Sequence, residues 1–476
     1  MTEVGARVAF LRALPPKLVL ALLLTSGSLV IGCAQIVPAD TSPEATGGWK
    51  IKFDGSGSSP VIADGVLYVG SADGAVYALD PKTGTTKWRF QTGESLSAAT
   101  SGPQVITVSP GTNISDQMSA GMNAATNRNT SGIRRVDMTP AVANGTVFIG
   151  AGDHSFYAID AATGQKKWAF VAGPGMASKI YSSPQWPAPM VHRGLVYCVA
   201  EDGLHALDMT TGERKWHFPG QGLTKRPAPG LAPDDSTIFL TRRDRVYAVA
   251  AESGTMRWEI TVDGVETTRP VAAKGWVLVG SSPNNLSKSD LPETLSAIGA
   301  ADGRVRWRLA AGRKHGPSRL FVAGSNTIYF STDTTLLAVE LDTGRQVWSF
   351  SADEIQGDVK ADDHHVYVVT NKGSMTRPRN TLHALALTTG QEKWSQRLSI
   401  AGSIRMLHDG VVYLEREAID AATGKTLWSF SGGGREEARL ISEGQIFLVS
   451  PTVTYFGLSR VDQGYLYALD ARTGKP

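Results

Sequence analysis

Short runs of alternating apolar and polar residues recur along most of this chain and predict β-strands. In residues 59–90, the runs VLYVG (66–70) and AVYALD (75–80) are joined by a glycine-containing turn, which is the pattern of a β-hairpin. A proline-led run precedes this hairpin, and the run KWRF (87–90) follows it. Because no 3.6-residue apolar period interrupts these runs, the segment is expected to form four short strands and no helix.

A motif that first reads YALDPKTGTTKW, at residues 77–88, occurs nine times and divides the chain into units. Its alanine and its glycine are present in all nine copies. Most of these glycines lie about 41 to 50 residues apart, which is the length of a four-stranded propeller blade. Such units cannot bury their apolar faces alone, so they are expected to stack as an array. The tryptophans of the array are Trp49, Trp88, Trp168, Trp216, Trp258, Trp307, Trp348, Trp394 and Trp428.

Within each motif, the Asp-x-x-Thr-Gly piece is expected to form a tight turn between the third and fourth strands. Asp80 and Thr83 offer side-chain oxygens to the local backbone, and Gly84 tolerates a positive φ. The small Ala78 lets an aromatic side chain approach closely, so Trp88 is expected to pack between adjacent units. Its burial would contribute a gross hydrophobic free energy of about 4–6 kcal/mol, before the entropy cost. Scattered binding tryptophans are the rival interpretation. Four copies lack the aspartate, and their turns are expected to be less firmly held: those at Ala250, Gly299, Glu340 and Ala386.

The motif Ala-x-Asp-x-x-Thr-Gly-x-x-x-Trp, found in register over residues 49–476, resembles the repeat of quinoprotein-like (PQQ-like) β-propellers. The resemblance implies an all-β fold, a closed β-propeller of four-stranded antiparallel blades. Nine units are counted here, whereas eight blades are usual for that family. Only 34 residues separate Gly390 from Gly424, so the unit between them is a candidate for degeneracy. The last copy ends before its tryptophan, and the run WKIKF (49–53) is expected to supply that fourth strand and close the ring.

The N-terminal segment has the pattern of an export signal. Three basic residues precede an apolar run over residues 18–31, which ends shortly before Cys33. This ending resembles a bacterial lipobox, with Val30 in the place of leucine, and implies that a diacylglycerol is attached to Cys33. We therefore expect a lipoprotein signal peptide at 1–32, lipidation at Cys33 and a flexible tether at 33–48. An uncleaved anchor helix is the alternative, although the run is shorter than the roughly 20 residues that span a bilayer.

Composition and charge narrow the class of protein further. The chain has 476 residues, a hydrophobic content of 42% and 51 glycines, which fits one large globular all-β domain. Its formal net charge of +3 is small, so no nucleic-acid partner is expected. Cys33 and Cys198 are the two cysteines. With Cys33 lipidated no internal disulfide can form, and Cys198, inside the apolar run LVYCVA, is expected to be a buried hydrophobic residue.

No pattern typical of catalysis stands out in the sequence. The nine histidines are scattered, and the chain has neither a P-loop nor a nucleophile-elbow signature. We therefore expect no catalytic residue, no bound cofactor and no metal ligand. The resemblance to quinoproteins implies an alternative, a PQQ-dependent dehydrogenase of alcohols or sugars that also holds calcium. Many alcohol-oxidising members carry adjacent cysteines against the cofactor, and this chain lacks such a pair, so we expect it not to be an enzyme.

A lipid-anchored propeller of this size is similar to the BamB lipoproteins of the outer-membrane β-barrel assembly machinery. The resemblance implies a non-enzymatic scaffold that docks a larger membrane protein, as a monomer within a complex. It also implies a location at the cell envelope, on the periplasmic face of the outer membrane in a Gram-negative organism. The contact residues of that family do not map onto this sequence. A further interpretation stays open, an extracytoplasmic module that binds a glycan or a sensor partner.

The departures from the repeat point to one face of the ring. Residues 93–131, 282–294, 371–380 and 451–464 exceed the repeat length, and 172–189 joins them. The first of these insertions lies between two units, and the next three lie between the second and third strands of their units. Both kinds of connection leave an antiparallel blade at the same face. Loops on a rigid scaffold often carry binding residues, although loops also tolerate insertion without function. We expect this face to bind the partner, with 93–131 a candidate for ordering on binding. The candidate contact residues are Tyr181, Trp186, Arg377, Arg379, Tyr455, Phe456 and Arg460.

Overall fold

The computed structural model describes residues 21–25, 28–32, 48–53, 57–93, 136, 138–153, 155–172, 188–200, 202–220, 231–233, 236–264, 266–268, 270–282, 294–310, 319–323, 326–373, 379–399, 402–430, 437–456 and 459–475. Over these residues the regular elements are strands, and no helix there is long and apolar enough to cross a membrane. The chain divides into two compact units. One comprises Met1–Glu44 and Glu94–Thr130, and the other comprises Ala45–Gly93 and Ser131–Pro476.

The first unit is described over one hairpin. Strand β1 (Ala21–Thr25) pairs antiparallel with β2 (Ser28–Gly32). The hairpin falls in the segment that the sequence marks as a signal peptide. Cys33, the expected tether except Gly48, and almost all of the expected insertion 93–131 lie outside the described residues, so the signal, the lipidation and the tether stay predictions.

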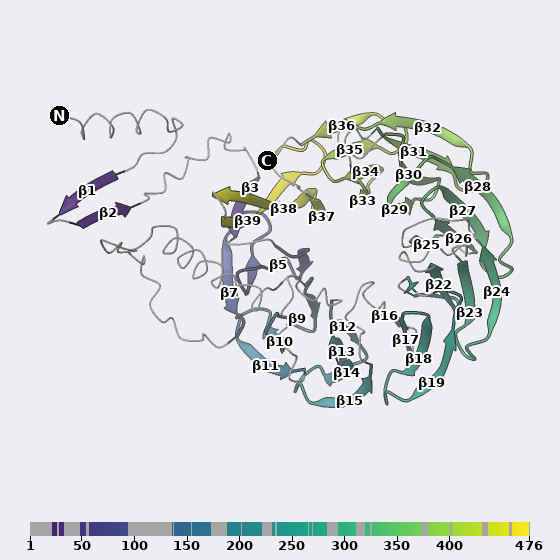
Figure 1. Cartoon of the computed structure of the whole chain (residues 1–476), viewed down its shortest axis with the longest axis horizontal. Helices are drawn as coiled ribbons and strands as arrows, with labels where there is room; N and C mark the ends of the chain where they lie inside the picture. Colours follow the sequence, from purple (N-terminus) through teal and green to yellow (C-terminus); the bar gives the residue numbers. More distant parts are fainter. Residues whose placement is uncertain are drawn as a thin grey trace. The chain divides into compact units, whose positions relative to one another are not determined.

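The described residues of the second unit form a ring of nine four-stranded antiparallel blades, which confirms the expected propeller (Figure 1). Blades one to three contain β4 (Val61–Ala63), β5 (Val66–Gly70), β6 (Ala75–Leu79) and β7 (Thr86–Gln91); β8 (Ala141–Ala143), β9 (Thr146–Gly150), β10 (Ser155–Asp160) and β11 (Lys166–Val171); and β12 (Met190–His192), β13 (Leu195–Ala200), β14 (Gly203–Asp208) and β15 (Arg214–Pro219).

The next three blades continue in chain order. They contain β16 (Leu231–Pro233), β17 (Thr237–Arg242), β18 (Arg245–Ala250) and β19 (Met256–Thr261); β21 (Val271–Ala273), β22 (Trp276–Ser282), β23 (Thr294–Gly299) and β24 (Val305–Ala310); and β25 (Arg319–Ala323), β26 (Thr327–Ser331), β27 (Thr335–Glu340) and β28 (Gln346–Ser351). The short β20 (Glu266–Thr267) also pairs with β22.

The last three blades complete the ring. They contain β29 (Ile355–Ala361), β30 (His365–Asn371), β31 (Asn380–Ala386) and β32 (Glu392–Arg397); β33 (Ile404–His408), β34 (Val411–Leu414), β35 (Glu417–Asp420) and β36 (Thr426–Ser429); and β37 (Glu437–Ser442), β38 (Gln445–Phe456), β39 (Ser459–Asp470) and, from the N-terminal side, β3 (Trp49–Phe53).

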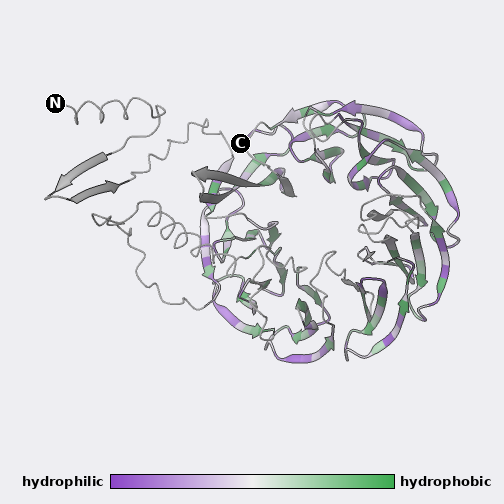
Figure 2. Ribbon diagram, viewed as in Figure 1, coloured by the Kyte–Doolittle hydropathy of each residue, from purple (hydrophilic) through white to green (hydrophobic). Residues whose placement is uncertain are grey.

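Apolar side chains gather on the second and third strands, which lie in the middle of each blade. All five residues of β9 are buried, whereas most of the outer strand β11 is exposed. Figure 2 shows this contrast around the ring, with hydrophobic residues on the inner strands and hydrophilic residues on the outer strands. Both sides of a blade are apolar, so each blade shares its core with two neighbours. The described core accordingly divides into nine clusters, each of which joins two adjacent blades.

Each tryptophan of the repeat packs on the turn glycine of the following blade. A Cβ added at Gly164 would lie 2.7 Å from Cδ2 of Trp88, so only glycine leaves room for the ring there. Gly164 also has a φ of 74°, which favours glycine. The indole Nε1 of Trp88 donates a hydrogen bond of 2.9 Å to the carbonyl of Ala161 in the same turn. The described blades repeat this arrangement nine times, which confirms packing, and not scattered binding, as the role of these tryptophans.

The ring closes through the N-terminal strand. Strand β3 pairs antiparallel with β39 and becomes the fourth strand of the last blade, with Trp49 opposite Ala468. The indole Nε1 of Trp49 then donates to the carbonyl of Pro81 in the first blade at 2.8 Å. The unit around Gly424, a candidate for degeneracy, has all four strands. The described part of the ring therefore has nine blades, one more than is usual for the quinoprotein-like family.

Where the turn aspartate is present, it accepts hydrogen bonds from the turn. Oδ1 of Asp160 accepts the amide and the hydroxyl of Thr163, each at 2.9 Å. In the turn at Ala250 this carboxylate is missing, yet the amide of Gly254 still donates to the carbonyl of Ala250 at 2.9 Å. All four turns without the aspartate keep this backbone bond. At Glu340 the longer carboxylate also accepts the hydroxyl of Thr343 at 2.6 Å. The expectation that these four turns are less firmly held stays a prediction.

The expected insertion at 451–464 does not form an irregular loop. Strands β38 and β39 run through it, and their pairing extends from Gln445 opposite Asp470 to Phe456 opposite Ser459. The added residues 451–456 read PTVTYF, and β-branched and aromatic side chains favour extended pairing. The insertion thus lengthens the second and third strands of the last blade into a longer hairpin.

Candidate functional site

The strand order gives the ring two different faces. Because consecutive strands pair antiparallel, the turns between strands one and two and between strands three and four share one face, here called the turn face. The connections between strands two and three and between blades share the other, here called the insertion face. Lys82 and Arg472, beside the Asp-Thr-Gly turns, are exposed on the turn face. The described ends of the insertions 282–294 and 371–380 lie on the insertion face.

Four of the seven candidate contact residues fall on described segments of the insertion face. Arg379 is exposed and directly precedes β31. Tyr455, Phe456 and Arg460 lie at the end of the β38–β39 hairpin, where the backbone register sets Tyr455 opposite Arg460. The structure thus brings three candidates together on one hairpin and leaves Arg379 on another blade. The remaining candidates lie outside the described residues: Tyr181, Trp186 and Arg377. Partner binding by these residues stays a prediction.

The insertion at 371–380 starts from a rigid base. Oδ1 of Asn371 accepts the amide of Gly373 at 3.0 Å and the amide of Arg379 at 2.9 Å, which holds the two ends of the insertion together. Its Nδ2 donates to Oε2 of Glu354 at 2.8 Å. Asn371 is buried, so these bonds are shielded from water. The scaffold therefore fixes the backbone at Arg379.

Cys198 lies in β13 and shows no sign of reactivity. Its side chain is fully buried, and burial raises the pKa of the thiol well above its ordinary value. The reactive thiolate is therefore disfavoured. This confirms Cys198 as a buried hydrophobic residue.

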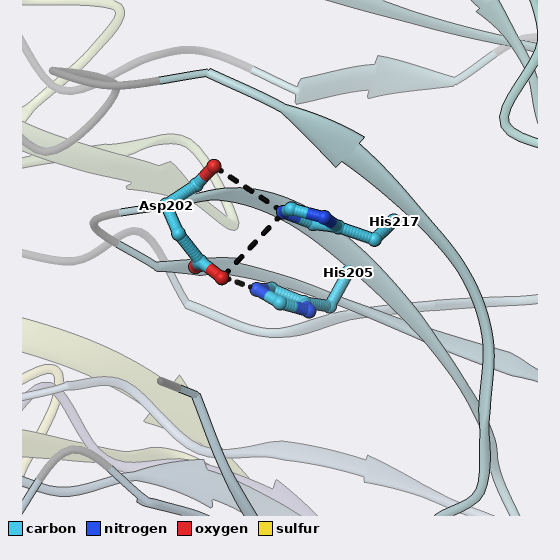
Figure 3. Close-up of side chains that lie close together, drawn as sticks. All are labelled: Asp202, His205 and His217. Carbon is cyan, nitrogen blue, oxygen red and sulfur yellow. Dashed lines mark hydrogen bonds and ion pairs between the residues drawn. The ribbon is translucent and has the colours of Figure 1, made fainter. Parts of the chain in front are cut away.

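Three side chains that the sequence analysis did not single out converge at the insertion-face end of the third blade (Figure 3). Asp202 stands in the turn before β14, His205 in β14 and His217 in β15. Nε2 of His205 lies 2.8 Å from Oδ1 of Asp202, and Nε2 of His217 lies 3.6 Å from Oδ2. The two imidazoles stack with their centroids 4.5 Å apart and their planes tilted by 20°. Nε2 of His217 is closer to the backbone carbonyl oxygen of Asp202, at 3.2 Å, so this ring faces both the carbonyl and the carboxylate of Asp202.

The repeat itself explains the contact between His205 and the turn aspartate. His205 takes the position that Tyr77 and Tyr157 hold in the first two blades. There the tyrosine hydroxyl donates to an aspartate of the turn between the second and third strands. In the third blade the imidazole of His205 makes this contact with Asp202 instead. The Asp202–His205 pair alone is thus a variant of the tyrosine–aspartate hydrogen bond of the first two blades.

His217 is the addition that makes this blade different. The strand register places it directly opposite His205, where the first blade has Arg89 opposite its tyrosine. Gly203 leaves the space for it, because a Cβ there would lie 2.8 Å from Nε2 of His217. Phe170 packs against the ring of His205, with centroids 5.2 Å apart. The imidazole of His205 is therefore held between the rings of Phe170 and His217.

Burial sets the charges of the cluster. The side chain of His205 is fully buried, and desolvation lowers its pKa although Asp202 acts in the opposite direction. Burial alone would raise the pKa of Asp202, but the hydrogen bond from His205, and the charge of that ring when it is protonated in acid, hold it below its ordinary value. At neutral pH, Asp202 is ionised and His205 is neutral. Among the described residues, buried Nδ1 of His205 has no hydrogen-bond partner, so Nε2 carries the ring proton and donates it to Asp202.

Two imidazole nitrogens and a carboxylate oxygen are ligands that divalent transition metals accept. No metal ligand is expected from the sequence, because the histidines are scattered along the chain. A signal was nevertheless present. His205 and His217 occupy positions of the repeat that face each other across strands three and four, and counting the register from the first blade would have paired them.

Comparison with known proteins gives one family. A sequence profile described as outer membrane protein assembly factor BamB matches residues 32–169, 111–291, 201–330, 291–378 and 375–476. The proteins of that name from Moranella endobia (strain PCIT) and Yersinia pestis are 26% identical over 205 residues and 25% identical over 294 residues. The first match covers 39% of this chain and 48% of the relative, and the second covers 56% and 70%. The chain thus spans about half the length of the first relative.

Solved structures resemble the ring at low similarity. BamB from Moraxella catarrhalis has a TM-score of 0.48 and 15% identity, over 81% of this chain and 100% of that chain. A quinohemoprotein alcohol dehydrogenase from Comamonas testosteroni also has a TM-score of 0.48 and 15% identity, over 89% of this chain and 76% of that chain. Neither likeness bears on what the chain does.

Proposed function

Because the chain belongs to the family described as outer membrane protein assembly factor BamB, we propose that it is a non-enzymatic scaffold that binds protein partners in the assembly of outer-membrane proteins. The observation that carries this proposal is the family match, whose segments together run from residue 32 to residue 476 and include every blade of the ring. The relatives bear the name of an assembly factor, and the scaffold role comes to this chain from that name.

The construction of the ring supports a docking role. Neighbouring blades are joined by repeated tryptophan–glycine contacts, so the ring is a stiff platform for the loops that it carries. Insertions from several blades leave the ring at one face, and a partner that touches several of them gains an interface of about 800 Å² per side. Arginine and aromatic residues dominate the energetics of such interfaces, and the candidates on the insertion face are of these types.

We place this scaffold at the cell envelope, held to the membrane by acyl chains on Cys33. The support is the basic start, the apolar run and the lipobox-like ending before Cys33. Two or more acyl chains give stable anchoring, at roughly 0.8 kcal/mol per buried CH₂. Residues 33–48 would then tether the ring within reach of a membrane-protein partner.

Direct measurements would distinguish the scaffold role from two other functions. A PQQ-dependent dehydrogenase would bind one quinone per chain in the presence of calcium and oxidise alcohols or sugars with a dye as electron acceptor. We expect neither binding nor turnover. A glycan-binding or sensor-binding module would retain a glycan or a sensor protein but no assembly subunit.

Crosslinking in native membranes tests the scaffold proposal. The full-length chain is crosslinked in the cells that produce it, purified under denaturing conditions, and the attached proteins are identified by mass spectrometry. We expect an outer-membrane β-barrel protein or a subunit of the machinery that inserts such proteins. Recovery of a sensor protein alone, or of no envelope protein, would contradict the scaffold role.

A further inference from the structure

We propose that Asp202, His205 and His217 bind a divalent transition-metal ion of the Zn(II) class on the outer strands of the third blade. This proposal is independent of the scaffold role. It rests on three ligand atoms of suitable types that converge from a turn and two strands (Figure 3).

The distances between the ligand atoms suit one small ion. Zn(II) binds imidazole nitrogen at about 2.0–2.1 Å and carboxylate oxygen at about 2.0–2.2 Å, which places tetrahedral ligand atoms roughly 3.3 Å apart. Nε2 of His217 lies 3.6 Å from Oδ2 of Asp202, and one ligand atom from each residue fits within a spread of 4.8 Å. Small rotations of Asp202 and His217 bring the atoms to coordination distance. Both side chains have that freedom, because they are 43% and 26% exposed.

The fold requires only one of the two histidines. In the first two blades a single tyrosine hydroxyl pairs with the turn aspartate, and the residue opposite that tyrosine is Arg89 or Ala169. Among the described strand pairs of the ring, the third blade is the one that sets two histidines opposite each other at this position. His217 therefore adds a second nitrogen donor to a carboxylate that already has a partner. Nε2 of His217 also lies 3.2 Å from the backbone carbonyl oxygen of Asp202, and this hydrogen bond would give way when the nitrogen binds an ion.

The ligand set selects the class of metal. Calcium and magnesium prefer sites made of oxygen atoms, whereas two imidazoles and one carboxylate suit Zn(II), Co(II), Ni(II) or Cu(II). The exposure of Asp202 and His217 leaves a fourth position open to water. When Nε2 of His205 binds the ion, the ring proton moves to Nδ1, which has no acceptor in the part of the chain that the structure describes. This lowers the affinity, so we expect a site that exchanges its metal.

Metal titration of the full-length chain in detergent tests the proposal. The chain carries no histidine tag and is first stripped with a chelator. Zn(II) binding is followed by calorimetry, and Co(II) binding by the visible absorption bands of a low-symmetry complex. We expect one equivalent of each metal to bind saturably. The variants Asp202→Asn and His217→Gln should each weaken binding at least tenfold, and Zn(II) should raise the Tm of the wild type but not of either variant.

A matched control separates this site from any surface histidine. His408 also lies beside a carboxylate, 3.3 Å from Oδ2 of Asp409, and is exposed. His408→Gln should leave the titration unchanged. Asp202→Asn and His217→Gln alter partly exposed side chains, so equal Tm values without metal would confirm that the variants are folded. The proposal is overturned if the wild type binds no saturable equivalent, or if both folded variants bind Zn(II) as tightly as the wild type.

Discussion

Trp49 of the N-terminal strand lies on Gly84 of the first blade, and a Cβ added at Gly84 would lie 2.6 Å from Cδ2 of its indole. The same strand pairs with β39, so Trp49 belongs to the last blade by its backbone and to the first blade by its side chain. The two ends of the ring are thus joined by the contact that joins every other pair of neighbouring blades.

Removing the closing strand should destabilise the whole ring. Deletion of residues 49–53 exposes the edge of β39 and removes the contact to the first blade, and should lower the free energy of unfolding by several kcal/mol. Trp49→Ala keeps the strand and should cost about 3 kcal/mol. Denaturant unfolding followed by circular dichroism measures both. Val171→Ala, at a side chain that is 65% exposed, is the control and should change stability by less than about 0.5 kcal/mol. A deletion variant with the wild-type Tm would mean that another segment closes the ring.

Two glycines allow the tryptophan contact to be isolated from backbone strain. Gly164 and Gly145 both have positive φ, 74° and 65°, but only Gly164 lies against a tryptophan ring, whereas nothing lies within 4 Å of a Cβ at Gly145. Each change to alanine should cost about 1–2 kcal/mol through its backbone conformation. Gly164→Ala must also displace Trp88, which should add about 1–3 kcal/mol. Equal losses of unfolding free energy for the two variants would show that the ring does not need the close approach.

The turn aspartates should make the ring sensitive to acid. The backbone amide of Thr163, its hydroxyl and Lys167 hold the pKa of Asp160 down to about 2. Since this folded pKa is below that of an unfolded aspartate, about 3.9, the carboxylate stabilises the fold above pH 4 and loses this effect as the pH falls towards 2. Asp160→Asn should therefore lower the Tm at pH 7 and make little difference at pH 2. An equal decrease in Tm at both pH values would exclude this linkage.

Lipidation should depend on one residue. Cys33→Ser removes the thiol that carries the diacylglycerol, so the variant should lack acylation and leave the membrane fraction. Mass spectrometry of the N-terminus and membrane fractionation measure the two effects. Cys198→Ser is the matched control and should be acylated as the wild type is. A Cys33→Ser variant that stays in the membrane with an intact N-terminus would instead indicate an anchor helix.

The blades and their packing could be predicted from the sequence because each depends on residues close together in the chain. Asp160, Thr163 and Gly164 lie within one turn, and the turn has the same form wherever its motif recurs. The spacing from glycine to tryptophan along the sequence is fixed, and it places every tryptophan side chain of the repeat, including Trp49, on a neighbouring blade. A short motif that recurs at regular intervals is therefore sufficient to predict the propeller and the strand that closes it.

Features that depend on register between strands could not be predicted in the same way. The segment 451–464 exceeds the repeat length whether it forms a loop or a longer hairpin, and only the pairing of Tyr455 with Arg460 distinguishes them. The cluster of Asp202, His205 and His217 arises because two histidines meet across a hairpin, with Gly203 leaving space for the second. Each histidine alone fits the repeat, so neither stands out along the chain.

We expect a membrane-protein partner to bind the insertion face of the propeller, and a pull-down from native membranes with two sets of variants tests this. Trp186→Ala, Arg377→Ala and Tyr455→Ala, from the insertions, should each weaken partner capture by about 1–2 kcal/mol or more, with Tm nearly unchanged. Lys82→Ala and Arg472→Ala, at exposed residues of the turn face, should leave capture as in the wild type. Loss of the partner by the turn-face variants, with capture retained by the insertion-face variants, would mean that the partner binds the turn face instead.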